Sequence, residues 1–293
     1  MDRIIAHTIT EEGKLSFSAS KYSGFKHGNK SDCEDFSSDL SKTIIEQLHN
    51  VFAEKVKRIG QCKVAVFGAP YNKVKTASSH LAARVTQLLN MYYDGTTCSF
   101  SELKIHRQHS YQQDYSAMSL ADREKSLSAE TYAFVPPVKE IEAEYDYALF
   151  IDDILITGAH ERRIQGLIDR EQFTVPYSFC YFAYLQPGCC EPQIEDRLNN
   201  ALFGRNLGQM HFHRFIVGLI NRGQFLPNTR VIKRIFSLDD KFLIIINEID
   251  VFQLKMLKDY AEKNKYHEHH LYRMNYELLS HKYFIKHAKL REE

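Results

Sequence analysis

The apolar positions in the first half of the chain predict strands that alternate with helices. Residues 31–58 carry apolar side chains at helical spacing, and residues 76–92 repeat this pattern over a shorter length. Compact apolar runs predict buried strands. These runs cover residues 62–70, 98–105, 131–135, 148–151 and 177–185. Because strands and helices alternate, we expect an α/β fold with an open, mainly parallel, twisted sheet flanked by helices.

The second half of the chain predicts helices only. Apolar residues recur at helical spacing over residues 212–220 and 242–262, with a helix start at Ser237 and Asp240 in the capping-box position. A polar, histidine-rich helix is expected over residues 267–289. The chain therefore divides into two predicted domains. These are an α/β domain with an N-terminal helix and hood at residues 1–189, and a helical C-terminal region at residues 190–293.

Charge and composition narrow the class of protein. The chain has 38 Lys and Arg against 37 Asp and Glu, a balance that gives no support for a nucleic-acid partner. No apolar run reaches the length of a membrane helix, and the N-terminus lacks the apolar core of a signal peptide. The six cysteines have neither zinc-site nor disulfide-framework spacing. We expect a cytoplasmic globular protein with no membrane partner.

The segment ALFIDDILITGAH, residues 148–160, carries the candidate chemistry. Its apolar start leads into Asp152 and Asp153, two like charges that a core would not tolerate without compensation. Thr157 and Gly158 then precede a predicted helix, whose first N–H groups and dipole attract phosphate. Ligands of open α/β sheets bind beyond the carboxyl ends of the strands. The segment thus predicts a ribose 5-phosphate site, with sugar hydroxyls on the aspartates and phosphate on the turn.

This segment resembles the phosphoribosyl-diphosphate motif of type I phosphoribosyltransferases. That motif has four apolar residues, two acids, a short apolar stretch and Thr-Gly-x-Thr, and the chain departs from it at His160, where the family usually has Thr or Ser. The resemblance implies that Asp152 and Asp153 are catalytic residues that orient the ribose. Because adjacent carboxylates repel, asparagine at both positions is expected to weaken ligand binding and leave the sheet folded. The implied phosphate-binding residues are Thr157, Gly158, Ala159 and His160.

Two further segments resemble parts of the same family. Residues 66–82 are similar in placement to the family's pyrophosphate loop, and residues 103–126 resemble its mobile hood loop. Arg107 is implied as a catalytic residue. The other residues implied to bind the diphosphate are Tyr71, Asn72, Lys73, Lys104 and Arg123. The resemblance extends over roughly residues 62–185.

The resemblance implies magnesium-assisted transfer of 5-phosphoribose from phosphoribosyl diphosphate (PRPP) to a nucleobase-like acceptor, with release of pyrophosphate. Mg²⁺ would be held mainly by oxygens of the substrate. Three alternatives stay open: a non-catalytic regulator that senses PRPP or a nucleotide, a hydrolase or lyase of ribosyl phosphates, and an interaction protein whose C-terminal helices dock a partner. The acceptor is not defined by the sequence, and a homodimer is expected only because dimers are common for this fold.

Overall fold

The protein contains a six-stranded, mainly parallel sheet, which confirms the predicted fold class. The computed structural model describes residues 2–10, 14–108, 131–188, 194–203 and 208–290. The strand order is β1-β6-β5-β2-β3-β4, and only β4 runs antiparallel to its neighbour. The strands are β1 (Asp2–Ile9), β2 (Cys62–Phe67), β3 (Cys98–Arg107), β4 (Tyr132–Val135), β5 (Tyr147–Leu155) and β6 (Tyr177–Leu185).

Helices cover both faces of the sheet, which explains why its strands read as continuous apolar runs. Side chains alternate along β2, so that Val64 and Val66 pack with α2 (Lys30–Ile59) and α3 (Ala77–Tyr92). The intervening side chains pack on the opposite face against α5 (Val138–Glu144) and α6 (Ala159–Arg170). The short helices α1 (Ala19–Lys26) and α7 (Ile194–Asn200) pack together, where the Ser23 hydroxyl donates to the Asn199 carbonyl.

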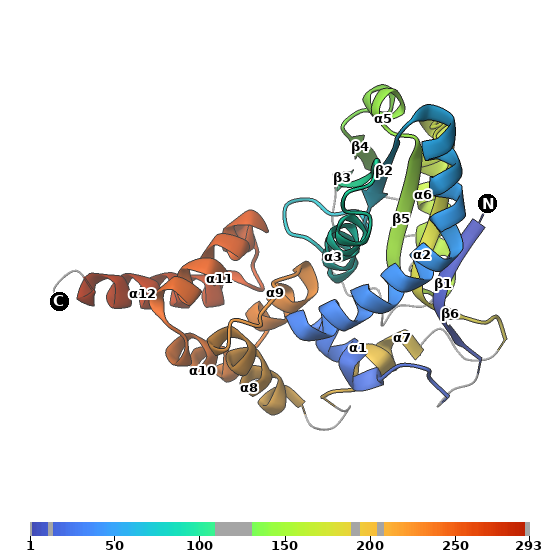
Figure 1. Ribbon diagram of the computed structural model, residues 1–293. Helices are drawn as coiled ribbons and strands as arrows, with labels where there is room; N and C mark the ends of the chain where they lie inside the picture. Colours follow the sequence, from blue (N-terminus) through green and yellow to red (C-terminus); the bar gives the residue numbers. More distant parts are fainter. Residues whose placement is uncertain (1, 11–13, 109–130, 189–193, 204–207, 291–293) are drawn as a thin grey trace.

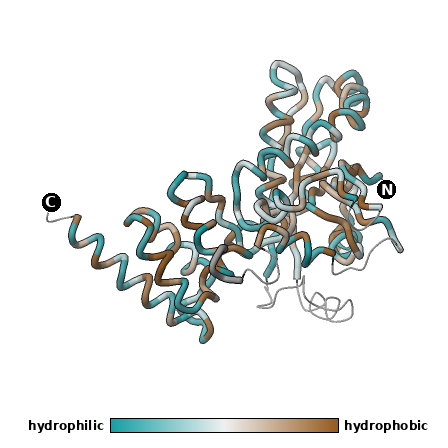
Figure 2. The backbone as a smooth tube through the Cα atoms, turned by 90° about the horizontal axis from the view of Figure 1, so that it is seen from below, coloured by the Kyte–Doolittle hydropathy of each residue, from teal (hydrophilic) through white to brown (hydrophobic). Residues whose placement is uncertain are grey.

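The remaining helices form what we call the C-terminal lobe, residues 208–290, which lies beside the sheet (Figure 1). The lobe has its own cluster of buried apolar side chains, and Figure 2 shows apolar stretches in both parts of the molecule. Its elements are α8 (Gly208–Asn221), α9 (Thr229–Phe236), α10 (Asp240–Glu248), α11 (Val251–Lys263), the 3₁₀ helix η2 (Tyr266–Glu268) and α12 (Arg273–Lys289). No helix among the described residues has the length and apolarity that a membrane span requires.

A short segment before α9, residues 224–229, fixes the lobe to the sheet domain. The Leu226 N–H donates to the Gly28 carbonyl at 2.8 Å, and the Thr229 hydroxyl donates to the Val74 carbonyl at 2.9 Å. Gly28 has φ +82°, and a Cβ there would lie 2.6 Å from the Leu226 carbonyl oxygen. Glycine therefore permits both the backbone conformation and the close approach of the lobe.

Two histidines at this junction, the buried His27 and the half-buried His80, predict that acid weakens the fold. Burial, and then the guanidinium of Arg234, lower the pKa of His27 to about 3, and burial lowers the pKa of His80 to about 4. Their pKa in the unfolded chain is about 6.5, so between pH 6.5 and 4 the unfolded chain binds more protons and stability falls as pH falls. We expect a loss of about 2 kcal/mol per histidine in the free energy of unfolding between pH 7.5 and pH 5.

Urea unfolding at the two pH values measures this loss. The double variant His27→Gln with His80→Gln should show a smaller pH dependence, whereas replacing exposed His281 by glutamine should leave it unchanged. A double variant that keeps the full pH dependence would contradict the assignment to these two side chains.

The structure also corrects several predicted boundaries. β5 does not end at the acidic doublet but continues through it to Leu155. Residues 242–262 form two helices instead of one, because Asp250 starts α11 with a capping box to Gln253. Asp239, and not Ser237, precedes α10, and its side chain makes no cap. β1 and α1 were not predicted, and most of residues 103–126, the segment that resembles the hood loop, lies outside the described residues.

Candidate functional site

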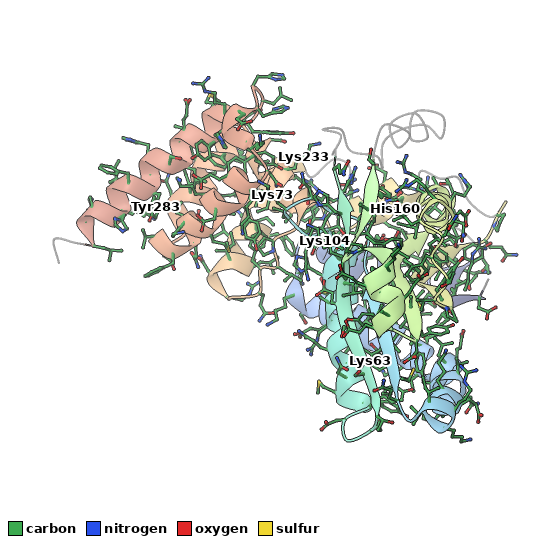
Figure 3. The ribbon with its side chains drawn as sticks, turned by 90° about the horizontal axis from the view of Figure 1, so that it is seen from above. Lys63, Lys73, Lys104, His160, Lys233 and Tyr283 are labelled. Carbon is green, nitrogen blue, oxygen red and sulfur yellow. The ribbon has the colours of Figure 1, made fainter. Side chains whose placement is uncertain are left out.

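A cleft of about 470 Å³ lies at the carboxyl ends of β2 and β5, between the sheet domain and the C-terminal lobe. Its sheet side is formed by the acidic doublet, by residues 154–161 and by the segment after β2. Its other wall comes from α9 and from the chain around η2. Figure 3 places Lys73 and Lys233 where the two parts of the molecule meet, with His160 on the sheet side and Lys63 at the opposite end of the sheet.

The turn between β5 and α6 has the features of a phosphate site. Gly158 is the N-cap of α6 and has φ +70°, a conformation that favours glycine. Gly158 itself has no side chain that could cap the first turn of α6. The Thr157 hydroxyl lies near the Ala159 N–H at 3.4 Å, and Arg162 donates to the Thr157 carbonyl at 2.9 Å. Backbone donors and the helix dipole are thus available to an anion in the cleft.

Asp153 is held in a buried network instead of pointing freely into the cleft. Asp153 is 4% exposed to solvent. Its carboxylate accepts hydrogen bonds from the Tyr22 hydroxyl at 2.9 Å and the Ser78 hydroxyl at 3.0 Å. It also forms an ion pair with the ammonium of Lys26, whose side chain is 10% exposed. Both oxygens of Asp153 therefore have protein partners, although the residue still borders the cleft.

This network sets the ionisation of its members. Burial alone would raise the pKa of Asp153, but the charge of Lys26 and the hydrogen bonds from Lys26 and Tyr22 hold it below its usual value. Burial, and then the Asp153 charge, raise the pKa of Tyr22 well above its usual value. Asp153 is thus an anion matched by Lys26, and Tyr22 stays a neutral hydrogen-bond donor. The ion pair with Lys26 therefore offsets the repulsion that we expected between the carboxylates of Asp152 and Asp153.

Asp152 is half-buried and pairs with the side chain of His160. The Asp152 Oδ2 and His160 Nδ1 atoms are 3.1 Å apart, and the Tyr132 hydroxyl lies 3.5 Å from the other ring nitrogen. The imidazole of His160 thus turns back to the carboxylate, while its backbone N–H belongs to the first turn of α6. Asp152 is the member of the doublet that stays in reach of a ligand.

Glu161 adds a third carboxylate at the cleft that the sequence did not single out. It is buried, and it accepts hydrogen bonds from Arg3 Nε and from the Tyr181 hydroxyl, each at 2.8 Å. Arg3 comes from β1 at the sheet edge, so the N-terminal strand neutralises a charge beside the phosphate turn. Glu161 therefore holds the start of α6 in place without making the turn repel an anion.

The predicted pyrophosphate loop runs beside β3. Asn72 and Lys73 line the cleft, and so does Arg107. Tyr71 and Lys104 are not among the lining residues, because the Lys104 ammonium lies 4.5 Å from the centre of the Tyr71 ring and donates to the Asn72 carbonyl. Burial lowers the pKa of Lys104. Lys104 thus supports the loop, and the predicted ligand Arg123 lies outside the described residues.

The sequence did not reveal the residues that reach the cleft from distant segments. Lys26, Tyr22 and Ser78 belong to this group. The lobe residues Arg230, Lys233 and His269 also line the cleft and lay outside the expected site.

An open parallel sheet, with an acidic doublet and a glycine turn at the carboxyl end of one strand, defines a type I phosphoribosyltransferase-like protein. The family model described as PRTase ComF-like matches residues 1–279, and the chain belongs to this family. The match extends beyond residues 62–185 and includes α8 to α11 of the lobe. A search among curated proteins finds no significant match to the chain.

Proposed function

We propose that the protein binds PRPP in this cleft and transfers its 5-phosphoribosyl group to a nucleobase-like acceptor, releasing pyrophosphate. The observation that carries the proposal is the first turn of α6, which begins at the Gly158 turn in the cleft a few residues after Asp152 and Asp153. The backbone of residues 157–161 would bind the 5-phosphate. Asp152 would accept hydrogen bonds from the ribose hydroxyls and stabilise positive charge that develops on the sugar ring.

Two cationic side chains that line the cleft favour departure of the diphosphate. Lys73 and Arg107 border the cleft on the side of the loop after β2, and their charges would attract the leaving group. The bond from carbon 1 to the diphosphate oxygen breaks, a bond to the acceptor nitrogen forms, and the proton of that nitrogen leaves to solvent. Asp153 would lie beside the reacting sugar. Its carboxylate is held in place by hydrogen bonds from Lys26, Tyr22 and Ser78, which act on the reaction only through it.

Magnesium fits this site as a partner of the substrate. Among the described residues no three His, Cys, Asp or Glu side chains converge on a metal position. Asp153 and Glu161 are already paired with cations, and Asp152, which lies beside the phosphate turn, would hold the ion. Mg²⁺ is usually held by one or two carboxylates and the substrate phosphates, so one carboxylate is sufficient. When bound, magnesium supplies charge neutralisation for the departing pyrophosphate.

A second candidate function is a sensor that binds PRPP without turnover. The buried network around Asp153 favours it, because a carboxylate whose two oxygens already have partners has less capacity to bind ribose hydroxyls. The loop after β2, in which the Lys104 ammonium lies over the Tyr71 ring, is bulkier than a glycine loop, and this also favours the sensor.

Pyrophosphate release separates the two functions. The full chain is incubated with PRPP, Mg²⁺ and a panel of bases, and binding of PRPP is measured by calorimetry in parallel. A transferase releases pyrophosphate only when an acceptor is present, and Asp152→Asn should abolish release. Asp169→Asn, which removes an exposed carboxylate from α6, is the matched control. Tight binding with no release from any base would sink the transferase and support the sensor.

His160 gives a further prediction for the phosphate turn. His160→Thr places a hydroxyl donor in the first turn of α6 and frees Asp152 from the imidazole. One added hydrogen bond to a charged group such as phosphate is worth about 1.5–3 kcal/mol, so we expect ribose 5-phosphate to bind about 10- to 150-fold more tightly. Calorimetry with His160→Ala as the comparison isolates the hydroxyl. Equal affinities of the threonine and alanine variants would contradict this role.

A further inference from the structure

The C-terminal lobe forms one wall of the cleft, opposite the sheet domain, and this wall is basic. We define this lobe wall as Arg230, Lys233, Lys263, Lys265 and His269, all of which line the cleft. The five residues come from α9, from the end of α11 and from the chain around η2. Figure 3 shows Lys233 at the boundary between the lobe and the sheet domain, while Tyr283 lies on the lobe away from it.

The fold holds the first two members of the lobe wall in a fixed orientation. Asn228 caps α9 by accepting from the Val231 N–H, and it also donates to the Lys26 carbonyl at 3.3 Å. Val231 and Ile232 are fully buried in the lobe core. Because residues three apart share a helix face, Arg230 and Lys233 point together toward the cleft.

The charges in the cleft favour an anionic ligand. Among the described residues its lining includes seven Lys or Arg side chains and four carboxylates. Lys26 is paired with Asp153, and Glu161 is paired with Arg3 from outside the cleft. Lys265 of the lobe wall is likewise paired with Glu268, which lies outside the cleft, at 3.3 Å. Four of the seven Lys and Arg side chains in the described lining belong to the lobe wall.

His269 supplies a neutral donor beside these cations. Its Nδ1 lies 3.2 Å from the Leu271 backbone nitrogen and accepts from that N–H, so the ring proton is on Nε2. The Nε2 atom is buried and has no hydrogen-bond partner among the described residues. The ring stacks on Tyr272 with centroids 4.6 Å apart, which fixes its plane. Burial, and then the charges of His270 and Lys233, lower the pKa of His269, which favours the neutral ring.

We propose that the lobe wall binds an oxyanion of the acceptor, and that the acceptor is therefore a small molecule carrying a carboxylate or phosphate. This inference rests on the proposed function, because the turn at residues 157–161 takes the 5-phosphate of PRPP and the loop with Lys73 takes its diphosphate. The lobe wall faces them across the cleft, where the attacking acceptor must enter. Its cations bind the acceptor's charge, and the Nε2–H of His269 donates one hydrogen bond.

Inorganic phosphate is the probe, measured by equilibrium dialysis of the full-length chain with radiolabelled phosphate. The wild type should bind two phosphates, one at the turn and one at the lobe wall. The triple variant Lys233→Gln, Lys263→Gln, Lys265→Gln should bind the second at least about tenfold more weakly, since charge-assisted contacts are lost. The matched control replaces Lys241, Lys255 and Lys289 by glutamine, an equal loss of charge outside the cleft. Arginine at the three wall positions should restore binding.

The outcomes separate this inference from the proposed function. Gly158→Val should remove only the phosphate at the turn. If it removes neither phosphate, the proposed function fails while the lobe wall stands. If the triple variant and its control bind phosphate equally, the lobe wall is not a phosphate site, and this conclusion does not depend on the result for the turn.

Competition in the Gly158→Val background, where only the wall site remains, identifies the anion. Displacement of phosphate by orotate indicates a carboxylate acceptor, and displacement by adenosine monophosphate indicates a phosphorylated one. Uracil and adenosine, the neutral counterparts, should displace none. Failure of both anions to compete at millimolar concentration would overturn the assignment of the lobe wall to the acceptor.

Discussion

Asp153→Asn is expected to lower the free energy of unfolding by about 3–5 kcal/mol, because it leaves the charge of Lys26 buried without a partner. The ion pair joins α1 to β5 across 127 positions of the chain, and both side chains are nearly excluded from solvent. Asparagine can keep the hydrogen bond from Tyr22 but carries no charge. Urea unfolding at pH 7.5 measures the effect.

Two further variants make this prediction specific. Asp152→Asn is the matched control, since Asp152 is half-buried and has no buried lysine partner, and it should cost less than about 1 kcal/mol. Adding Lys26→Met to Asp153→Asn should recover part of the lost stability, because it removes the unpaired charge. If Asp153→Asn costs no more than Asp152→Asn, the pair does not stabilise the fold. The sequence alone led us to expect that asparagine at both positions leaves the sheet folded. Because of the ion pair, we now expect the double variant to be less stable than the wild type.

Gly158→Val is expected to weaken ribose 5-phosphate binding on the order of 10- to 150-fold, the value of one hydrogen bond to a charged group. Gly158 has φ +70°, which a β-branched residue rarely adopts, and its Cβ would lie 3.3 Å from the Arg162 guanidinium. The turn must therefore shift and its N–H groups lose their alignment. Calorimetry with ribose 5-phosphate measures the change.

Gly166→Val is the control for this variant. Gly166 lies in the middle of the same helix, and a Cβ there would meet nothing within 4 Å. It should bind ribose 5-phosphate with the wild-type affinity. A loss of affinity in both variants would mean that α6 as a whole was disturbed, and unchanged affinity in Gly158→Val would remove the turn from the site.

The local part of the site could be predicted from the sequence, because strand, acidic doublet, turn and helix follow one another within residues 148–160. Their geometry depends on backbone preferences at Gly158 and on apolar patterning, which are local properties. The same patterning predicted the order of strands and helices in the sheet domain. It did not show that β5 continues past the aspartates, because Ile154 and Leu155 do not by themselves distinguish a strand from a turn.

The rest of the site depends on contacts between distant segments. Nothing near Lys26 in the sequence indicates that its charge meets Asp153, and nothing near Lys104 indicates that it stacks on Tyr71 instead of facing the cleft. The lobe reaches the cleft because residues 224–229 bind the sheet domain through backbone groups, whose partners leave no pattern in the side chains. Periodicity predicted helices for this region but not the surface that they present.

The position of the phosphate of ribose 5-phosphate, in crystals soaked with that compound, tests the central claim most directly. We predict the phosphate within hydrogen-bonding distance of the backbone N–H groups of residues 158–161, with a ribose hydroxyl on Asp152. A turn without the phosphate, with the compound bound elsewhere or not at all, would contradict the claim.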